Sequence, residues 1–473
     1  MEVRILEKAI RRARLRVPAR ASAFYFTANA AAKAVGLATT PIFTRILSGD
    51  GYGEYTLYMS CLGFASVLVS SLTTGVHSLA ALRESEEKKE EYTCALLGVG
   101  VSFSLLICIL LFALSPFLGL NRDLFILMSI QLTCDTAVAI YCMRERYSYR
   151  YYSVCAVSVA QSLLSPTLAI LLIRGAHLGY LGRIYALLIA SLTVATPAFK
   201  ALASRGGRLY DRDLWRGIAS RSAPLIPYAL TSALSLQTDR LVISRTMGRA
   251  ALASYSVAHA LGAAVSVVCS ALLSSLSPWI IRRLSYGDIR RVRDVGGECI
   301  YVIGALSVIP AALAPELMSL LAPTAYSEAI PAVFPIALST LPAFSAEFCS
   351  VGLISRGDGG RVSAYSITAS VITVVSAIIL TRVLGYLGAG CALLAGQTVA
   401  AIIATRALRE SDAREMLPTR ECASVYTAAA VLCLLSFMLR ESLAARGAVL
   451  VAVLAIVAWR ALPLYRLVRE REN

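Results

Sequence analysis

Five charged side chains of this sequence fall within long apolar stretches, where an ionised group is costly. They are Lys33, Asp135, Asp239, Arg240 and Glu347. A bare charge at the centre of a lipid bilayer costs about 3 kcal/mol or more, so such a residue is retained where it faces water, protein or a partner. Each of the five is therefore a candidate residue of a substrate cavity.

Two glutamines lie close to these charges in the sequence. Gln131 precedes Asp135 by one helical turn, and Gln237 stands two residues before Asp239. A cation in such a setting can hold an anionic ligand, and a carboxylate can pair with that cation when the ligand is absent. The exchange of one partner for another would shift an equilibrium between two conformations. The alternative for Asp239 and Arg240 is an interhelical salt bridge that only fixes packing.

Three further polar residues lie within apolar stretches, namely Gln161, Gln397 and His259. The glutamines add uncharged hydrogen-bonding groups. We expect His259 to be a packed, hydrogen-bonded residue more often than a proton relay, because a single histidine in a span usually is.

The composition indicates what surrounds these residues. The chain has 473 residues, of which 57% are hydrophobic and 16% charged, against about 25% charged in soluble domains. Many windows of about 20 residues lack charge almost completely, as in helices that cross a hydrocarbon layer about 30 Å thick. Runs such as 99–114 and 367–380 show no alternation of polar and apolar residues. We therefore predict helices and not barrel strands.

The apolar runs predict an all-α integral membrane protein with about 14 membrane-spanning helices. The predicted spans are 22–44, 55–77, 93–118, 123–143, 152–173, 179–200, 222–244, 251–278, 298–321, 330–355, 362–380, 386–405, 423–439 and 447–465.

Lysine and arginine are distributed unevenly over the loops between these spans. With both termini placed in the cytoplasm, 34 of the 45 basic residues lie on the cytoplasmic side and eight on the opposite side. This asymmetry is typical of multi-pass membrane proteins, and it predicts a chain in the cytoplasmic membrane with both ends in the cytoplasm. The net charge of +16 then favours contact with anionic membrane lipids and not with nucleic acid.

The loops divide the chain into five predicted parts. Residues 1–20 form a basic cytoplasmic arm, either an amphipathic helix on the inner membrane surface or a disordered segment. Residues 21–200 form an N-terminal lobe of six spans, and 201–221 form a cytoplasmic linker. Residues 222–408 form a C-terminal lobe of six spans, and 409–473 hold the last two spans and a cytoplasmic tail.

A short internal repeat supports two related lobes. Arg45 precedes Tyr55 by ten residues after the first span, and Arg245 precedes Tyr255 by the same distance after the seventh. Internal repeats are common in membrane transporters. We place Arg45 and Tyr55 as candidates for the outer mouth of a transport pathway.

Other residue patterns exclude several kinds of chemistry. The 12 cysteines form no CxxC pair and sit mostly inside apolar runs, so we expect packing residues and not metal ligands. The sequence has no GxxxxGK[ST] motif, which excludes ATP-driven transport within this chain. No pattern predicts a catalytic centre, a metal site or a bound cofactor.

The stretch from Phe24 to Tyr58 contains a small-residue span with a lysine, a Pro-x-Phe-Thr-Arg-x-Leu turn and a Tyr-Gly-x-Tyr segment. The residues concerned are Lys33, Pro41, Phe43, Thr44, Arg45, Leu47, Tyr52, Gly53 and Tyr55. This set resembles the opening of O-antigen-type polysaccharide and oligosaccharide flippases of the multidrug/oligosaccharidyl-lipid/polysaccharide export superfamily. The seventh span, with Pro224 and Pro227 ahead of Asp239, is similar to the start of their second lobe.

The resemblance implies a fold and a function. It implies two pseudo-symmetric six-helix lobes around a central cavity, with two added C-terminal helices. It implies a flippase that moves a polyprenyl-diphosphate-linked oligosaccharide to the outer leaflet by alternating access, often coupled to a proton or sodium gradient. Lys33 or Arg240 would hold the diphosphate or an acidic sugar, and Asp135, Asp239 or Glu347 would be that cation's alternative partner. Other polysaccharide assembly proteins are implied as partners.

Two other functions stay open at this point. A cation-coupled exporter of drugs or other small molecules from the same superfamily would favour an apolar cavity with acidic sites. A membrane enzyme of saccharide assembly is the second, because Asp211-Arg-Asp213 has the Asp-x-Asp spacing that holds a metal-bound nucleotide sugar. Such an enzyme would need a sizeable soluble domain or large outer loops, for which the predicted spans leave no room. We therefore expect a transporter and not an enzyme.

Overall fold

The computed structural model describes residues 27–28, 31–74, 89–148, 150–204, 207–223, 226–410, 416–440 and 442–469. These residues are helical almost throughout and contain no strand. Twelve helices within them are long and apolar enough to cross a membrane. Lipid offers the backbone no hydrogen-bond partners, and a helix satisfies its own N–H and C=O groups. The predicted fold class, an all-helical multi-pass membrane protein, is confirmed.

The predicted spans coincide with observed helices. Two of them, 22–44 and 222–244, correspond to helices outside these twelve, namely a helix over residues 31–46 and α10 (Ile226–Thr246). The predicted basic arm, 1–20, lies outside the described residues.

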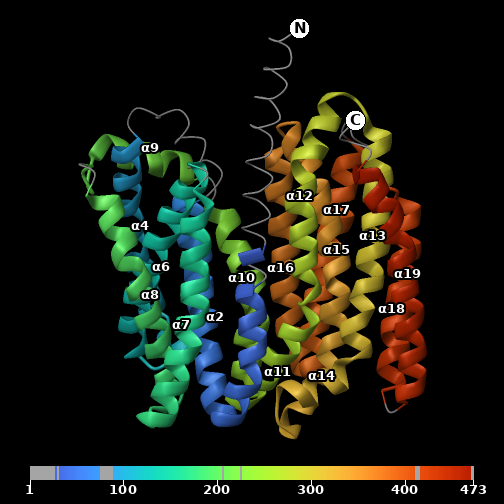
Figure 1. Cartoon of the computed structure of the whole chain (residues 1–473), viewed down its shortest axis with the longest axis horizontal. Helices are drawn as coiled ribbons and strands as arrows, with labels where there is room; N and C mark the ends of the chain where they lie inside the picture. Colours follow the sequence, from blue (N-terminus) through green and yellow to red (C-terminus); the bar gives the residue numbers. More distant parts are fainter. Residues whose placement is uncertain are drawn as a thin grey trace. The chain divides into compact units, whose positions relative to one another are not determined.

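The chain folds into two compact units, of which the first comprises residues 1–47 and 57–233. Within it α7 packs against α8, and α6 packs against both α4 and α8 (Figure 1). Its helices after the one over 31–46 are α2 (Gly49–Thr73), α4 (Lys89–Ala113), α5 (Ser115–Leu118), α6 (Leu124–Tyr147), α7 (Tyr151–Gly175), α8 (Gly179–Ala203) and α9 (Arg212–Ser222).

The second unit comprises residues 48–56 and 234–473. Its core forms around α15, which contacts α11, α12, α13, α17 and α18. Its helices after α10 are α11 (Arg249–Gly262), α12 (Val265–Ser285), α13 (Ile289–Ala312), α14 (Ala314–Leu321), the 3-10 helix η2 (Thr324–Ala329), α15 (Ile330–Ser355), α16 (Gly359–Leu384), α17 (Tyr386–Arg409), α18 (Thr419–Met438) and α19 (Leu443–Arg469).

Three predicted spans are interrupted in the structure. The predicted spans 93–118 and 298–321 each end in a short separate helix, α5 and α14, and both short helices carry a proline in the first turn. Proline lacks an N–H and cannot continue the preceding helix. The predicted span 251–278 is divided between α11 and α12, where the backbone tightens into shorter hydrogen-bonded turns at Ala263 and Ala264.

The segment predicted as a cytoplasmic linker contains the amphipathic helix α9. Asp211 caps this helix, because its carboxylate accepts hydrogen bonds from the backbone N–H groups of Asp213 and Leu214, both at 3.0 Å. An aspartate at this position satisfies donors that the first helical turn leaves open. The Asp-x-Asp spacing therefore has a structural explanation that needs no metal-bound nucleotide sugar.

The segment before α9 packs tightly on α4. A Cβ atom added at Gly98 of α4 would lie 2.0 Å from the carbonyl oxygen of Leu209, so only glycine fits there. Trp215 donates its indole N–H to the same carbonyl at 2.9 Å. The region predicted as a linker is thus part of the first unit's packing.

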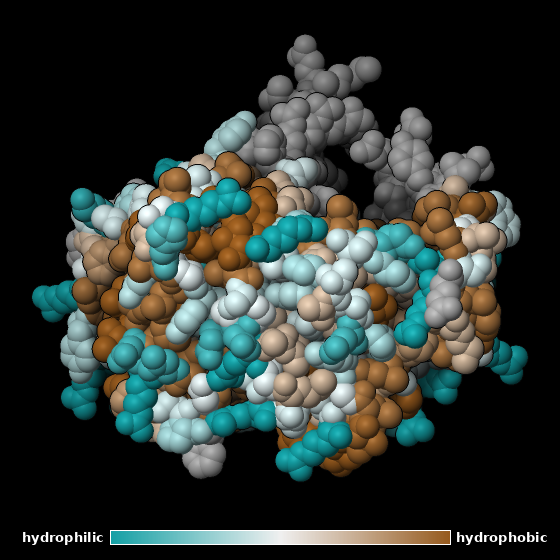
Figure 2. Space-filling view, turned by 90° about the horizontal axis from the view of Figure 1, so that it is seen from below, coloured by the Kyte–Doolittle hydropathy of each residue, from teal (hydrophilic) through white to brown (hydrophobic). Residues whose placement is uncertain are grey.

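The outer surface of the helices is strongly apolar. Leu106, Ile109, Val383 and Trp459 are among the large hydrophobic side chains that are 48–74% exposed. Figure 2 shows broad hydrophobic areas beside the hydrophilic residues of one end face. Exposed apolar area of this extent marks a surface that meets lipid.

A buried ion pair ties the last helix to the second unit. Arg446 of α19, whose side chain is 5% exposed, donates from both terminal nitrogens to Glu316 of α14 at 2.6 Å. It also donates to the carbonyl of Ala312 at 2.9 Å. These hydrogen bonds lower the pKa of Glu316 below its ordinary value. The charged pair therefore stabilises the fold most where Glu316 is ionised.

The substitution Glu316→Gln should destabilise the protein at neutral pH, by about 1 kcal/mol because water screens a partly exposed carboxylate. The stabilisation is complete above the ordinary glutamate pKa and is lost as pH falls through the lowered pKa of the folded state. Thermal unfolding measured from pH 7 into acid should show the two proteins converge. The control Glu410→Gln, at a side chain 72% exposed, should change nothing. A difference that persists at every pH would contradict this account.

Candidate functional site

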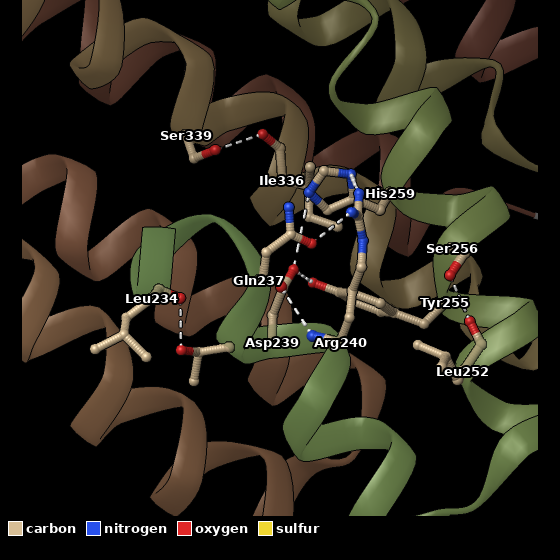
Figure 3. A network of polar contacts seen from close by, with 11 residues as sticks. Leu234, Gln237, Asp239, Arg240, Leu252, Tyr255, Ser256, His259, Ile336 and Ser339 are labelled. Carbon is tan, nitrogen blue, oxygen red and sulfur yellow. Dashed lines mark hydrogen bonds and ion pairs between the residues drawn. The ribbon is translucent and has the colours of Figure 1, made fainter. Parts of the chain in front are cut away.

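The densest polar network of the second unit lies where α10 meets α11 (Figure 3). Helix α10 supplies Gln237, Asp239 and Arg240, and α11 supplies Tyr255 and His259. Tyr255 and His259 are four residues apart and therefore project from the same face of α11. The network thus joins three of the predicted site residues to two others.

Asp239 is the acid of this network and is 3% exposed. Its carboxylate accepts a hydrogen bond from the Tyr255 hydroxyl at 2.6 Å and one from the backbone N–H of Arg240 at 2.8 Å. The Nε2 atom of His259 lies 3.8 Å from the same carboxylate. Hydrogen bonds to an ionised carboxylate are stronger than those between neutral groups, so these donors stabilise the charge in a nearly water-free site.

Arg240 lies on the other side of the histidine ring. Its guanidinium donates to Gln237 Oε1 at 3.1 Å and contacts His259 Nδ1 at 3.2 Å. Arginine has no acceptor, so His259 must accept at Nδ1, and the neutral ring then carries its proton on Nε2, towards Asp239. The imidazole therefore separates the acid from the guanidinium. The Arg240 Nε atom is buried without a hydrogen-bond partner in the described part of the chain.

Asp239 and Arg240 lie on the same helix and do not pair with each other in the described residues, whereas Asp239 reaches α11 through Tyr255 and His259. The Asp239 carboxylate contacts the backbone of Arg240, and the described residues form no side-chain ion pair between the two. The contacts between helices are made instead by Tyr255 and His259. The network can therefore exchange partners without a guanidinium–carboxylate pair having to break.

Helix α11 is held in place by the beginning of α2. Arg249, the first residue of α11, donates its Nε–H to Glu54 at 2.9 Å and also contacts Ser244. A Cβ atom added at Gly53 would lie 2.1 Å from the Arg249 carbonyl oxygen. Tyr52 packs edge-on against Tyr326. The Tyr-Gly-x-Tyr segment therefore fixes the position of the helix that carries Tyr255 and His259.

A second polar network lies inside the first unit, between α6, α7 and α8. Asp135 accepts hydrogen bonds from Gln131 Nε2, at 3.1 Å to each carboxylate oxygen, and from the Ser191 hydroxyl at 3.0 Å. The Ser191 oxygen in turn accepts from Gln131 at 2.6 Å and from Gln161 at 2.9 Å. Gln131 and Ser191 are at most 1% exposed. The described residues place no basic side chain in hydrogen-bond or ion-pair contact with Asp135.

The other predicted site residues stand apart from these two networks. Lys33 is exposed on the helix over 31–46, and Glu347 is exposed on α15 without a hydrogen-bond or ion-pair partner in the described region. Arg45 donates to the carbonyl of Pro41 at 3.1 Å. Tyr55 is half-buried with its ring 6.3 Å from that of Tyr52. Whether any of them contacts a substrate stays a prediction.

The sequence pattern pointed to the charges and missed some of their partners. Tyr255 is fully buried against Asp239, whereas Tyr55, at the corresponding position of the internal repeat, is half-buried. The spacing of Tyr255 and His259 was the available signal, because it places both on one helical face. Ser191 carried no signal, since a serine in an apolar helix is common.

No group of three or more histidine, cysteine, aspartate or glutamate side chains in the described ranges could hold a metal ion. The two networks instead consist of one carboxylate each with hydroxyl, amide and, in the second unit, imidazole groups. Such sets bind protons, monovalent cations or anionic groups more readily than transition metals.

Comparison with known proteins places the chain in a family. Residues 19–283 match the family model described as polysaccharide biosynthesis protein. The chain belongs to this family. No curated protein sequence matches it.

Several solved structures of flippases and transporters share the fold of this chain. The lipid II flippase MurJ, in an inward closed conformation, has a TM-score of 0.72 and 11% identity, and the match covers 93% of this chain and 99% of that one. An inward-facing multidrug resistance MATE family transporter has a TM-score of 0.57 and 14% identity, and the match covers 82% of this chain and 95% of that one. A third structure is a MOP superfamily transporter from Pyrococcus furiosus, described as having a binding pocket of reverse polarity. It has a TM-score of 0.59 and 15% identity, and the match covers 83% of this chain and 95% of that one.

The substitution Tyr255→Phe should destabilise the protein by about 1–3 kcal/mol, because it leaves a buried carboxylate with one donor fewer. Thermal or denaturant unfolding in detergent measures this. Tyr286→Phe is the matched control, since that side chain is 78% exposed and should tolerate the change. Equal effects of the two substitutions would show that the Tyr255 hydroxyl does not hold Asp239.

Proposed function

We propose that the chain is a flippase that moves a polyprenyl-diphosphate-linked oligosaccharide from the cytoplasmic to the outer leaflet, for the synthesis of a surface polysaccharide. The observation that carries this proposal is membership of the polysaccharide biosynthesis protein family over residues 19–283. A fold shared with flippases and transporters supports it. In this proposal the chain lies in the cytoplasmic membrane with both termini in the cytoplasm, and it works beside other polysaccharide assembly proteins.

In this proposal the α10–α11 network is the element of the carrier that responds to an anion. Arg240 makes neutral hydrogen bonds to Gln237 and His259 and has one buried donor unused. A diphosphate oxygen offers the guanidinium a stronger, charge-assisted bond than either neutral partner. Arrival of the anion would therefore draw Arg240 away from His259. Lys33, exposed on the helix over 31–46, is the second cation proposed to meet the substrate.

Protonation of His259 would act in the same direction as the anion. A proton on Nδ1 removes the lone pair that Arg240 contacts, and it places two like charges next to each other. The imidazolium would then pair with Asp239, which is 3.8 Å from Nε2. Proton uptake by His259 and loss of its contact with Arg240 are thus linked. Each event would favour the other by the same free energy.

The Asp135 network is our candidate for coupling to a proton or sodium gradient. Its carboxylate is surrounded by one hydroxyl and two amides, and Gln131 Oε1 is buried without a partner in the described structure. Rotation of an amide by 180° would turn an oxygen towards the site in place of a nitrogen. Carboxylate, hydroxyl and amide oxygens are ligands that suit a hard cation. A proton or a sodium ion would supply the positive charge that the neighbouring side chains lack.

A drug exporter is the second candidate function, because a multidrug resistance MATE family transporter shares the fold. Cells that express the chain would then remove fluorescent cationic dyes. The lipid-saccharide proposal expects no such efflux, since the α10–α11 network presents a guanidinium to an incoming ligand.

The flippase proposal predicts that Arg240→Gln and Lys33→Ala each slow transport while the protein still inserts. A lost hydrogen bond to a charged ligand is worth about 1.5–3 kcal/mol, so the rate should fall about tenfold or more. The assay follows a fluorescent polyprenyl-diphosphate-linked disaccharide across proteoliposomes. Arg212→Gln, at an exposed position of α9, should behave like the unchanged protein. Normal rates in both variants would remove the cavity-cation idea, and absence of flipping by the unchanged chain would count against the function.

The coupling proposal predicts that Asp135→Asn abolishes the response of flipping to an imposed pH or sodium gradient. The amide cannot change its charge, so the rate should become the same with and without the gradient. Ser129→Ala, on the same helix, removes a hydroxyl that donates to the Phe125 carbonyl of α6 and should preserve the response. A gradient effect that survives in D135N would assign the coupling to another residue.

A further inference from the structure

A groove of about 260 Å³ lies between α17 and α18 in the second unit. Both helices pack on α15, so α15 lies behind the groove. One face of α17 and one face of α18 line it, because the lining residues recur at intervals of three and four along each helix. They are Ala401, Ile402, Thr405, Arg406, Arg409, Leu417, Thr419, Cys422, Ala423 and Tyr426.

The inner part of the groove is mostly apolar and its few polar groups are already satisfied. Tyr426 donates its hydroxyl to Ser345 of α15 at 2.5 Å, and Thr405 donates to the Ala401 carbonyl at 2.6 Å. The remaining lining away from the arginines consists of aliphatic side chains and Cys422, and Ile402 is 47% exposed. A hydrocarbon chain would be accommodated there without leaving a buried polar atom unpaired.

One end of the groove is strongly positive. Arg406 and Arg409 occupy the last turn of α17, and both are exposed. Arg409 donates to the Thr419 hydroxyl at 2.8 Å, and neither arginine forms an ion pair with a carboxylate of the described residues. The N–H groups in the first turn of α18 face the same end and favour an anion.

Of the described carboxylates near this end, Glu410 and Glu421, neither pairs with Arg406 or Arg409. Glu410 pairs with Arg361 at 3.6 Å. Glu421 is exposed in the first turn of α18. Within the described residues the two arginines are not bound to a carboxylate, so their guanidinium groups suit a ligand that carries its own negative charge.

We propose that this groove binds one anionic phospholipid, with its phosphate between Arg406 and Arg409 and an acyl chain along Ile402 and Ala423. Ile402 and Arg409 are seven positions apart, which is about 10 Å along the helix and accommodates the upper part of an acyl chain. Basic pockets between membrane helices at the cytoplasmic side are suited to anionic headgroups. The predicted orientation places the two arginines at that side, where most of the basic residues lie. This proposal depends on the groove and not on the transported substrate.

A lipid fits these features better than a free phosphate ion. The positive end and the apolar inner part are continuous along the same two helices, and both helices are membrane spans. A small anion would use the arginines alone and would gain nothing from the aliphatic lining. Charge and hydrocarbon contact together therefore select an amphipathic ligand.

Native mass spectrometry of the full chain in detergent tests the proposal. Phosphatidylglycerol and phosphatidylcholine of equal chain length are added separately, and glycerol 3-phosphate is added as a competitor. We expect one phosphatidylglycerol to be retained about tenfold or more in preference to phosphatidylcholine, since each arginine adds roughly fivefold. Glycerol 3-phosphate should not displace it.

Two variants locate the bound lipid. Arg406→Gln with Arg409→Gln should remove the preference, whereas Arg212→Gln with Arg216→Gln, two exposed arginines of α9, should retain it. Ala423→Trp fills the groove without changing the charge and should also prevent retention, which guards against a folding defect of the arginine variant. Retention unchanged in both groove variants, or lost equally in the α9 control, would overturn the proposal. Displacement by glycerol 3-phosphate would show a phosphate site and not a lipid site.

Discussion

The buried carboxylate of Asp239 constrains how α10 and α11 pack together. A membrane interior supplies neither water nor counter-ions, so the protein itself must provide every donor that keeps this charge stable. Tyr255 and the Arg240 backbone do so directly, and His259 stands between the acid and the guanidinium. Because these donors come from α10 and α11, the pairing of those helices depends on the charge. Glu54 and Gly53 at the start of α2 then hold α11 against this arrangement. A change in the ionisation or the hydrogen-bond partners of Asp239 would therefore affect the packing of α2, α10 and α11.

The two networks differ in whether a positively charged side chain accompanies the carboxylate. Around Asp239 the acid and the base are both present, so the network is close to electrical balance and an incoming anion would compete with existing neutral contacts. Around Asp135 the neighbours are a hydroxyl and two amides, and none of these side chains carries a positive charge. A carrier that couples an anionic substrate to a cation gradient needs one element of each kind. The proposed function thus assigns separate tasks to α6–α8 and to α10–α11.

Sequence patterns predicted the membrane helices well, because lack of water forces a long uncharged run wherever the chain crosses lipid. The same reasoning selected Asp135, Asp239 and Arg240, since an ionised group in such a run is exceptional. It could not predict where a span breaks, because the division between α11 and α12 arises from local turn geometry at Ala263 and Ala264. Nor could it find Ser191, whose role depends on three helices meeting at one point. Asp211 shows why a short spacing alone is a weak signal, since the Asp-x-Asp pattern could have held a metal and the structure uses Asp211 as a helix cap.

The ion pair between Arg446 and Glu316 has a consequence for how the protein is made. The two residues are 130 positions apart, and a ribosome that adds 5–20 residues per second needs roughly ten seconds to travel that distance. During this interval Glu316 is already synthesised and its partner does not yet exist. Until α19 emerges, the Glu316 carboxylate lacks the guanidinium that it contacts in the folded chain. The contact of Arg446 with Glu316, like the packing of α19 on α13, therefore forms only after most of the second unit has been synthesised.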